Sequence, residues 1–509
     1  MKLLFVFLLG AILGIALLPY ALFRQKEMPA GTNLQSPDFA ATNAELLMDR
    51  TFWDSAAGSP WQQHRIFDFI LEDIRSAESF IIADFFLWNP WSGAVEQASA
   101  LRPLSQELAD ALIAKKAARP EMPILVLTDP INRIYGRHTP EFYDRMVDAG
   151  IAVVFTDLSQ LPESNRLYAA QVEFWSKFFS SKTIVAQFAW IPNPFNPVGA
   201  RLSLSELGRL LYFKANHRKV LISGRSDGAH RLIVGSLNPA DGSANHSNLA
   251  LRVNGAVAHY AAESELSIAN WSAQSAHNIH QGRVDLVADT VDGIRRYIAP
   301  AVAAPLFEPD ALRVAWRSEG AIRQEILMQL DTATTGTRVD LVLFYLSDRL
   351  VVQALKDAIR RGVAVRLLLD ANRDAFGRAK TGIPNRIVAA ELMALSDLHA
   401  VEIRWASTHG EQFHPKALRV VGGGQDLVFL GSANWTRRNI GNLNLEANLL
   451  LKNAGDLGEA FDDYFESLWG NTDGLEASVP YSAWAETGWS LYWKRSLYHF
   501  QEWSGLSTF

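Results

Sequence analysis

The chain contains two copies of one succession of helix and strand patterns, and this repeat constrains the fold more than any other feature. Each copy reads as two helix-then-strand pairs followed by one more apolar strand. The ranges are 66–88, 104–136 and 151–157 in the first half, and 322–346, 351–377 and 400–406 in the second half. Helices that alternate with near-continuous apolar strands predict α/β layers around a largely buried sheet, formed twice.

Each repeat then ends in the same polar motif. The first half reads NHRK followed by GSLN, and the second half reads FHPK followed by GSAN. The step from histidine to serine is 19 residues in the first half and 18 in the second. The matching residues are His217, Lys219, Ser236 and Asn238 in one half, and His414, Lys416, Ser432 and Asn434 in the other.

The two halves differ in length between the second strand of the repeat and the histidine. From Asp129 to His217 is 88 residues, whereas from Asp370 to His414 is 44. The first half therefore carries an insertion of about that difference, centred on residues 158–202. The two aspartates end strands, and we expect them to cap the loops that follow, although such strand ends can also face a site.

A histidine and a lysine two residues apart on a strand lie on one face of the sheet. Pairing the halves about a pseudo-twofold axis would bring two copies of each motif residue together. Two lysines with hydroxyl and amide donors suit a phosphate oxyanion, and two histidines offer a nucleophile and a general acid. Single histidines in strands are more often core residues, and we assign His230, His246, His399 and His409 to that class.

The paired motifs resemble those of the phospholipase D superfamily, whose signature is HxKxxxxD followed by GSxN, twice in one chain. The resemblance covers most of residues 45–475. It implies a pseudo-dimeric fold of two α/β/α units with one site between them, and cleavage or transfer of a phosphodiester through a phosphohistidine. It also implies a catalytic role for the histidines and lysines, and phosphate binding by the serines and asparagines of both motifs.

Two departures from the family pattern concern residues around the histidines. The signature aspartate, five residues after each lysine, is replaced by Gly224 and Val421, with Asp227 and Asp426 as possible displaced substitutes. In this family that aspartate resembles a structural residue more than a chemical one.

The other departure concerns the histidine-orienting residues. These are Glu446 in the second half and Asn248 in the first, and an asparagine supports an imidazolium less well than a carboxylate does. The resemblance favours His217 as the nucleophile, whereas the within-half carboxylate favours His414, so both assignments stay open here.

The N-terminus and the composition bear on location and cofactors. Residues 3–23 are uncharged and long enough to cross a bilayer, which predicts a single-pass N-terminal transmembrane helix within a membrane anchor over residues 1–27, with the catalytic part on the exported side. The chain has no cysteine and shows no metal-ligand cluster, so we expect neither cofactor nor metal. The remaining segments are a first half over 45–270, a second half over 300–475 and an aromatic-rich C-terminal segment over 476–509.

The predicted substrate is a membrane phospholipid, with water or an alcohol as acceptor. A net charge of −6 does not favour a nucleic acid as partner, and aromatic clusters at 85–93, 174–195 and 484–503 suit a bilayer interface. These aromatics could instead pack the two halves together, which for Trp88 and Trp91 is an equal alternative, and stacking on single-stranded nucleic acid is the rival function. Two other functions therefore stay open: a membrane-anchored nuclease of the same superfamily, and an inactive lipid- or phosphate-binding relative. No obligate oligomer is predicted.

Overall fold

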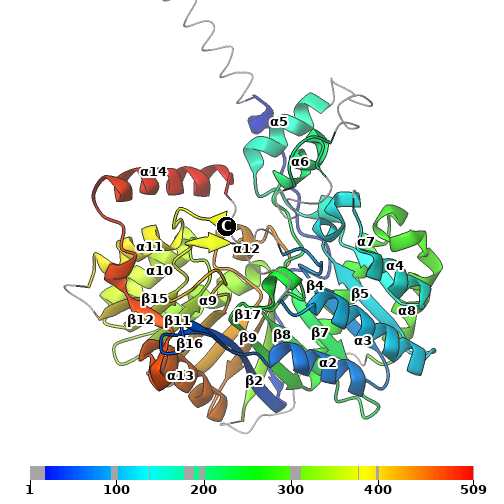
Figure 1. The fold of residues 1–509 in the computed structure, drawn as a ribbon, viewed down its shortest axis with the longest axis horizontal. Helices are drawn as coiled ribbons and strands as arrows, with labels where there is room; N and C mark the ends of the chain where they lie inside the picture. Colours follow the sequence, from blue (N-terminus) through cyan, green and yellow to red (C-terminus); the bar gives the residue numbers. More distant parts are fainter. Residues whose placement is uncertain are drawn as a thin grey trace, which may run out of the picture.

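The computed structural model describes residues 18–92, 101–136, 138–176, 189–193, 201–298, 311–375, 378–396 and 400–507. Within these residues the chain forms two lobes that lie side by side, each built on a nine-stranded sheet (Figure 1). The first sheet contains β2 (Thr42–Asp54), β3 (Ser59–Gln63), β4 (Ile81–Phe85), β5 (Ile124–Thr128), β6 (Ala152–Phe155), β7 (Lys219–Ser223), β8 (Arg231–Gly235), β9 (Asn248–Asn254) and β19 (Leu475–Glu476). The second contains β1 (Phe39–Ala40), β10 (Arg313–Ser318), β11 (Arg338–Leu343), β12 (Ala364–Leu369), β15 (Val401–Ala406), β16 (Lys416–Gly422), β17 (Gln425–Gly431), β18 (Ala447–Lys452) and β20 (Ser478–Pro480).

The order of the strands confirms the predicted repeat. The first sheet runs β2-β9-β8-β7-β4-β5-β6, and the second runs β10-β18-β17-β16-β11-β12-β15, so each strand has a counterpart at the same position. In both sheets the two helix-then-strand pairs and the following strand form a parallel segment, and the motif-bearing strands add antiparallel pairs. The fold is therefore a mixed α/β unit that occurs twice. The two halves also exchange edge strands, because β1 extends the second sheet and β19 extends the first.

Helices cover the sheets on their outer faces and close the space between them. The helices of the first half are α2 (Ile66–Ser76), α3 (Leu104–Ala118), α4 (Glu141–Asp148), α5 (Arg166–Ser176), α6 (Leu204–Leu210), α7 (Ala256–Ser272) and α8 (Val284–Arg295). Those of the second half are α9 (Gly320–Thr332), α10 (Arg349–Arg360), α11 (Asn385–Met393), α12 (Arg437–Ile440), α13 (Asp456–Trp469) and α14 (Gly488–Ser504). The largest buried cluster draws on both sheets together with α7 and α13, so one continuous apolar core joins the halves.

The first half carries its extra chain between β6 and β7. This segment includes α5 and α6, which rise above the ends of the strands on the side where the C-terminus also lies (Figure 1). In the second half, residues 407–415 connect β15 to β16 directly. Most of the predicted aromatic cluster at 174–195 lies outside the described residues. Trp190, which is described, is 61% exposed.

The structure contradicts the predicted N-terminal membrane anchor. No helix within the described part of the chain is long and apolar enough to cross a membrane. Residues 1–17, on which most of that prediction falls, lie outside the described residues. The exported location that was inferred from the anchor is withdrawn with it.

Trp88 and Trp91 serve neither of the two roles considered from the sequence. Trp88 is fully buried, contacts the rings of Phe142 and Tyr143 and donates its indole N–H to the Ser105 carbonyl at 2.9 Å. It belongs to the outer core of the first half, between the sheet and its helices. Trp91 is 8% exposed and packs with Ile134 and Leu202 of the same half. These tryptophans therefore neither join the two halves nor face a bilayer.

Candidate active site

Both motif histidines enter their strands through a hydrogen bond to the opposite half. The His217 amide donates to the Leu445 carbonyl at 2.9 Å, and the His414 amide donates to the Ser247 carbonyl at 3.0 Å. Each contact is part of a short parallel bridge between the halves. The residue that follows each acceptor is a predicted histidine-orienting residue, so the bridges bring the orienting side chains of one half to the histidine of the other.

The orienting contacts are consequently crossed between the halves. His217 Nδ1 lies 2.7 Å from Glu446 Oε1, and His414 Nδ1 lies 3.2 Å from Asn248 Oδ1. The within-half pairing assumed from the sequence, in which Glu446 would support His414, is therefore wrong. Its cause is geometric: at the junction of the two sheets β9 lies against β17, and β8 lies against β18. The carboxylate thus supports the same histidine that the family resemblance favours as nucleophile.

The two lysines occupy equivalent places at the start of β7 and β16. Lys219 Nζ donates to the His217 carbonyl at 2.7 Å, and Lys416 Nζ donates to the His414 carbonyl at 2.6 Å. Each ammonium also lies over an aromatic ring, Phe86 in the first half and Phe344 in the second. Both ammonium groups are thereby held in place on one face of each sheet, as the strand period predicted.

Burial and mutual repulsion perturb the titration of these groups. Burial lowers the pKa of Lys219 to about 7, and it lowers that of Lys416 well below its ordinary value, with the Lys219 charge adding to the effect. Burial also lowers the pKa of His217 to about 4 although Glu446 opposes the change, and that of His414 falls well below its ordinary value. Burial thus disfavours the positive charge of all four side chains. A bound anion would stabilise those charges.

The motif serines hold the orienting residues in place. The Ser236 hydroxyl donates to Asn248 Oδ1 at 2.9 Å, and the Ser432 hydroxyl donates to Glu446 Oε2. Both hydroxyl oxygens also accept a backbone N–H, and both side chains are fully buried. Their single protons are committed inside the protein, which differs from the phosphate contact expected from the sequence.

The motif asparagines remain the available amide donors of the site. Asn238 and Asn434 follow the ends of β8 and β17 and are 4% and 7% exposed. Asn238 Oδ1 accepts the Leu87 N–H at 3.4 Å, which leaves its amide nitrogen directed elsewhere. Asn434 Oδ1 is buried without a hydrogen-bond partner among the described residues.

The strand-end aspartates position the chain just before each histidine. Asp129 Oδ2 accepts the N–H of Asn216 at 2.8 Å, and Asp370 Oδ2 accepts the N–H of Phe413 at 2.9 Å. The other oxygen of each carboxylate accepts a backbone N–H two residues on, at Ile131 and Asn372, as a loop cap does. The predicted capping role is correct, and the same carboxylates also fix the approach of the catalytic strands.

The positions of the missing signature aspartates lie at the far ends of these strands. Gly224 follows β7, and a Cβ atom there would lie 2.3 Å from Ser79 Oγ, so a larger residue would require the neighbouring side chains to shift. Asp426 pairs with Arg419 at 2.5 Å near the distal turn of β16 and β17. Asp227 accepts the N–H of Ala229 in an exposed turn. Neither aspartate contacts a motif histidine or lysine in the described structure, so neither is a displaced substitute.

Sequence reasoning missed a buried ion network beneath the site. Arg218, between the first histidine and lysine, is fully buried and pairs with Glu265 at 2.9 Å and with Glu319 at 2.7 Å. Glu319 belongs to the second half and accepts the backbone N–H of Glu446 at 3.0 Å. The network therefore connects Arg218 of the first half to Glu446, the orienting carboxylate of the second half. The arginine between the first motif histidine and lysine was the only signal for it.

Two of the histidines predicted to be core residues, His230 and His246, have different surroundings. His230 is a structural residue, as predicted, since its ring nitrogens contact the Arg225 N–H and the Tyr297 carbonyl. His246 instead lies beside the site, with its ring centroid 6.0 Å from that of His414. Its place just before β9 follows from the bridge between the halves. His409 stacks on Trp53, and His399 lies outside the described residues.

The described residues include no group of three or more histidine, aspartate or glutamate side chains placed to hold a metal ion. The site brings together imidazole, ammonium, carboxylate and amide groups that come from both halves.

The chain is similar to known proteins in the sequence of its second half and in its fold. Residues 326–469 match the model of a family described as "Cardiolipin synthase, PLD-like domain", which covers most of the second half. No curated protein matches the sequence.

Solved structures share the fold at low sequence identity. Phosphatidylserine synthase from Haemophilus influenzae Rd KW20 is 11% identical, with a TM-score of 0.55 over 92% of this chain and 96% of that chain. Nuc, a phospholipase D family member from Salmonella typhimurium, is 20% identical over 31% of this chain and 95% of its own, with a TM-score of 0.25. The synthase likeness supports the fold of both halves, whereas the second value is too low to support an argument. Residues 326–469 thus match a PLD-like domain, the likeness to the synthase shows the fold of both halves, and the duplicated motif resembles that of the phospholipase D superfamily.

Proposed function

We propose that the chain is a phosphodiester hydrolase or phosphatidyltransferase that acts on membrane phospholipid through a phosphohistidine intermediate. The observation that carries the proposal is the crossed arrangement of the site, in which each half supplies a histidine and the other half orients it. Such an arrangement makes both halves necessary for one reaction centre. It also gives the two histidines unequal partners, a carboxylate and an amide, as two different roles require.

In the first step, His217 is the nucleophile. Its Nδ1–H faces Glu446, which leaves the lone pair on Nε2 to attack phosphorus. The new N–P bond forms as the P–O bond to the leaving alcohol breaks, and His414 gives that alcohol its proton. The carboxylate stabilises the positive charge that develops on the attacking imidazole, and the two lysines stabilise the equatorial phosphate oxygens.

In the second step, water or an acceptor alcohol attacks the phosphohistidine. His414 takes the proton of the incoming O–H group, and the N–P bond breaks to release the neutral His217 imidazole. Burial and the nearby Lys416 charge hold the pKa of His414 well below its ordinary value, so the imidazole is neutral and can accept this proton. Bound phosphate would offset the lysine charges and favour the protonated form of His414 before the first step.

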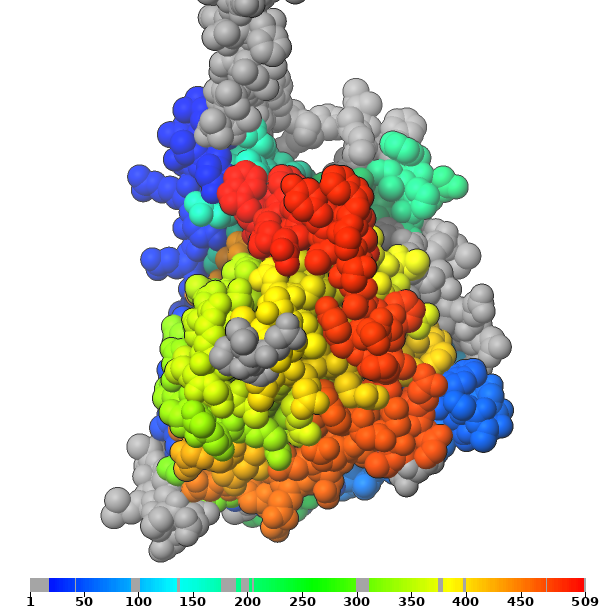
Figure 2. All heavy atoms as spheres, turned by 90° about the vertical axis from the view of Figure 1, so that its left-hand side faces the viewer, coloured from blue at the N-terminus to red at the C-terminus, as the bar shows by residue number. Residues whose placement is uncertain are grey.

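The C-terminal helix favours a lipid substrate over a nucleic acid. Five aromatic residues of α14 lie at positions i, i+3, i+4, i+11 and i+14, which is one face of a helix. They are 41–76% exposed: Trp489 76%, Tyr492 65%, Trp493 41%, Phe500 50% and Trp503 69%. The opposite face is anchored, because buried Tyr498 donates its hydroxyl to the Ser347 carbonyl at 2.7 Å. Figure 2 shows α14 as an uncovered ridge on the second half.

A membrane surface is the occupant that this aromatic face suits. The face contains no charged residue, and Arg495 and His499 flank one side of it. Tryptophan and tyrosine rings next to basic side chains favour the interfacial layer of a bilayer, where their apolar bodies are buried and their polar groups stay hydrated. The matched family description, which names the synthase of a phospholipid, supports the same substrate class.

The experiment that tests this function is a product analysis with the purified full chain. It is incubated with phospholipid in mixed micelles, with and without an added alcohol, and with single-stranded DNA in parallel. We expect release or transfer of the phosphatidyl group, abolished by His217→Ala and by His414→Ala with the fold intact. Cleavage of DNA without turnover of phospholipid would show a nuclease, and no turnover of either would indicate an inactive relative.

A further inference from the structure

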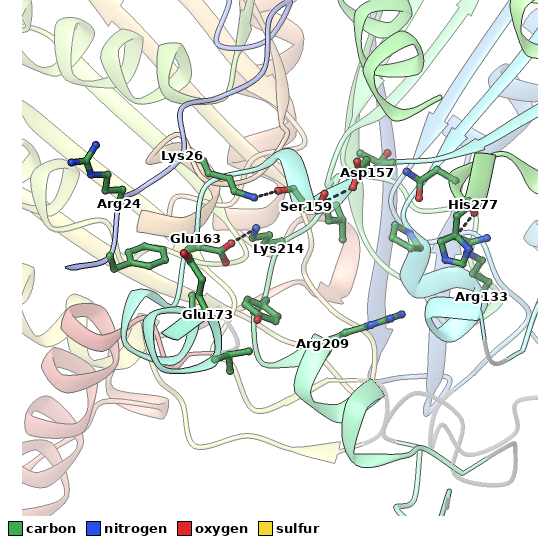
Figure 3. A pocket seen from close by; sticks show the side chains of 18 residues that line it. Arg24, Lys26, Arg133, Asp157, Ser159, Glu163, Glu173, Arg209, Lys214 and His277 are labelled. Atoms are coloured by element: carbon green, nitrogen blue, oxygen red, sulfur yellow. Dashed lines mark hydrogen bonds and ion pairs between the residues drawn. The ribbon is translucent and has the colours of Figure 1, made fainter. Parts of the chain in front are cut away.

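A second cavity lies apart from the paired histidines. It has a volume of about 750 Å³ and lies in the first half, beneath α5 and α6 and beside the chain at residues 23–26. None of the motif residues lines it. Its side chains converge from separate segments of the chain, as the close view of the cavity shows (Figure 3). The cavity is therefore a separate feature of the first half and is partly built from its extra chain.

Arg133 is the unusual residue of this cavity. It belongs to a 3-10 turn over Pro130–Gly136, directly after the strand-end Asp129. Arg133 is only 8% exposed, yet no carboxylate of the described residues forms an ion pair with its guanidinium. Its single hydrogen bond runs from Nη2 to the His277 carbonyl at 3.1 Å, and its Nε is buried without a partner in the described structure. A buried guanidinium without a carboxylate is costly unless an anion completes it.

A second guanidinium reaches the same place from the opposite wall. The side chain of Arg209, on α6, extends across the cavity toward Arg133 (Figure 3). Burial lowers the pKa of Arg133, and the charge of Arg209 lowers it further, which means that the two cations repel each other. The Arg133 guanidinium also lies 4.3 Å over the Phe155 ring, which fixes its position.

Two of the three carboxylates that line the cavity have partners other than Arg133. The charged lining residues are Arg24, Lys26, Arg133, Arg209 and Lys214, against Asp157, Glu163 and Glu173. Glu163 is engaged by Lys214 at 2.5 Å, and Asp157 accepts the N–H of Ser159 at 3.1 Å as a helix cap. Cationic side chains therefore outnumber carboxylates in the lining by five to three, in a chain whose net charge is −6.

We propose that this cavity binds a phosphate group, carried by a soluble ester or by a phospholipid, with Arg133 and Arg209 as its ligands. Two guanidinium groups on opposite walls match the oxygens of a phosphate, and each can donate two parallel N–H bonds. Apolar lining residues, Phe23, Val172 and Tyr212, are placed to contact the rest of the ligand. The site goes beyond the proposed reaction, because it binds an anion that is not the one transferred.

Equilibrium dialysis of the full chain with labelled inorganic phosphate tests the site without measuring turnover. Wild-type protein should bind phosphate at two sites, and Lys416→Met should remove the one between the histidines. Arg209→Gln and Arg133→Gln should weaken the other by about tenfold or more, the effect of losing a charge-assisted hydrogen bond. Arg295→Gln, a change to a half-exposed arginine of α8 outside the cavity, is the control and should change neither.

The variant Arg209→Gln carries the test if Arg133→Gln unfolds, because Arg209 is exposed on its helix. Equal phosphate affinity and stoichiometry in the wild type and Arg209→Gln would overturn the proposal, whatever the catalytic activity of either. Glycerol 3-phosphate and monomeric dihexanoyl phosphatidate then identify the source. Equal dissociation constants for the two indicate a soluble phosphate ester, whereas tighter binding of phosphatidate indicates a lipid that also contacts the apolar wall.

Discussion

Replacing Glu446 by glutamine should slow the formation of the phosphohistidine while leaving the fold of the site nearly unchanged. The substitution keeps the shape of the side chain and removes its charge, 2.7 Å from Nδ1 of His217. A hydrogen bond to a charged group contributes about 1.5–3 kcal/mol, against about 0.5–1.5 kcal/mol for a neutral pair. The difference of about 1–2 kcal/mol corresponds to a loss of roughly 5- to 30-fold in rate.

The loss should be larger than this if the amide of the new glutamine turns its NH₂ group toward Nδ1. Asn439 and Ser432 both donate to Glu446, and these donors favour an oxygen at each end of the side chain. A glutamine has to place its NH₂ group against one donor or against His217. In the latter case the imidazole is forced into the wrong tautomer, with its proton on the nitrogen that should attack.

The assay is the single-turnover rate of alcohol release from a phosphodiester with a good leaving group, which isolates the first step. Glu486→Gln is the matched control, since Glu486 is also a buried, paired glutamate but contacts Lys494 in the C-terminal segment. A change of less than twofold in the single-turnover rate of Glu446→Gln would contradict a role for the Glu446 charge in the first step. An equal loss in Glu486→Gln would contradict it as well.

Three further predictions concern pH, the missing aspartate and the aromatic helix. Folding lowers the pKa of Lys219 from 10.5 to about 7, so the unfolded chain binds more protons between these pH values. Stability should therefore rise with pH from about 7 upward, and Lys219→Met should remove a slope of up to about 1.4 kcal/mol per pH unit in chemical denaturation; an unchanged slope would contradict this. Gly224→Asp, which restores the family aspartate, should lower the melting temperature by overpacking worth about 1–3 kcal/mol, and an unchanged melting temperature would show that the site has room. The double change Trp489→Ser and Trp503→Ser should weaken binding to anionic vesicles at least tenfold, since burying one such side chain contributes about 1.5–3 kcal/mol, whereas Leu350→Ser on α10 should not; equal vesicle binding in both variants would argue against a membrane-facing helix.

Much of the fold could be predicted because the sequence repeats its periodicity. The helix-then-strand pairs and the two polar motifs occur at matching distances, and the two sheets place their strands in the same order. The same pattern located the histidines and lysines of the site, because a strand period of two residues fixes the face on which they lie.

What could not be predicted are contacts that depend on how the two halves meet. The pairing of Glu446 with His217 requires the bridge between Leu445 and His217, which joins segments far apart in the chain. The role of the serines changes for the same reason, since their hydroxyls follow the crossed orienting residues. Likewise, no local pattern indicates that Arg133 lies in a cavity with a second arginine, because Arg209 comes from the segment inserted between β6 and β7.

The central claim is that His217 attacks phosphorus at a site shared by the two halves. Its most direct test is to quench a reaction under alkaline conditions, which preserve phosphohistidine, and to locate the label by mass spectrometry of peptides. The proposed mechanism predicts an acid-labile phosphoryl or phosphatidyl group on His217, which is absent in His217→Ala and persists longer in His414→Ala. A label on His414 or on a serine, or turnover without any covalent intermediate, would contradict it.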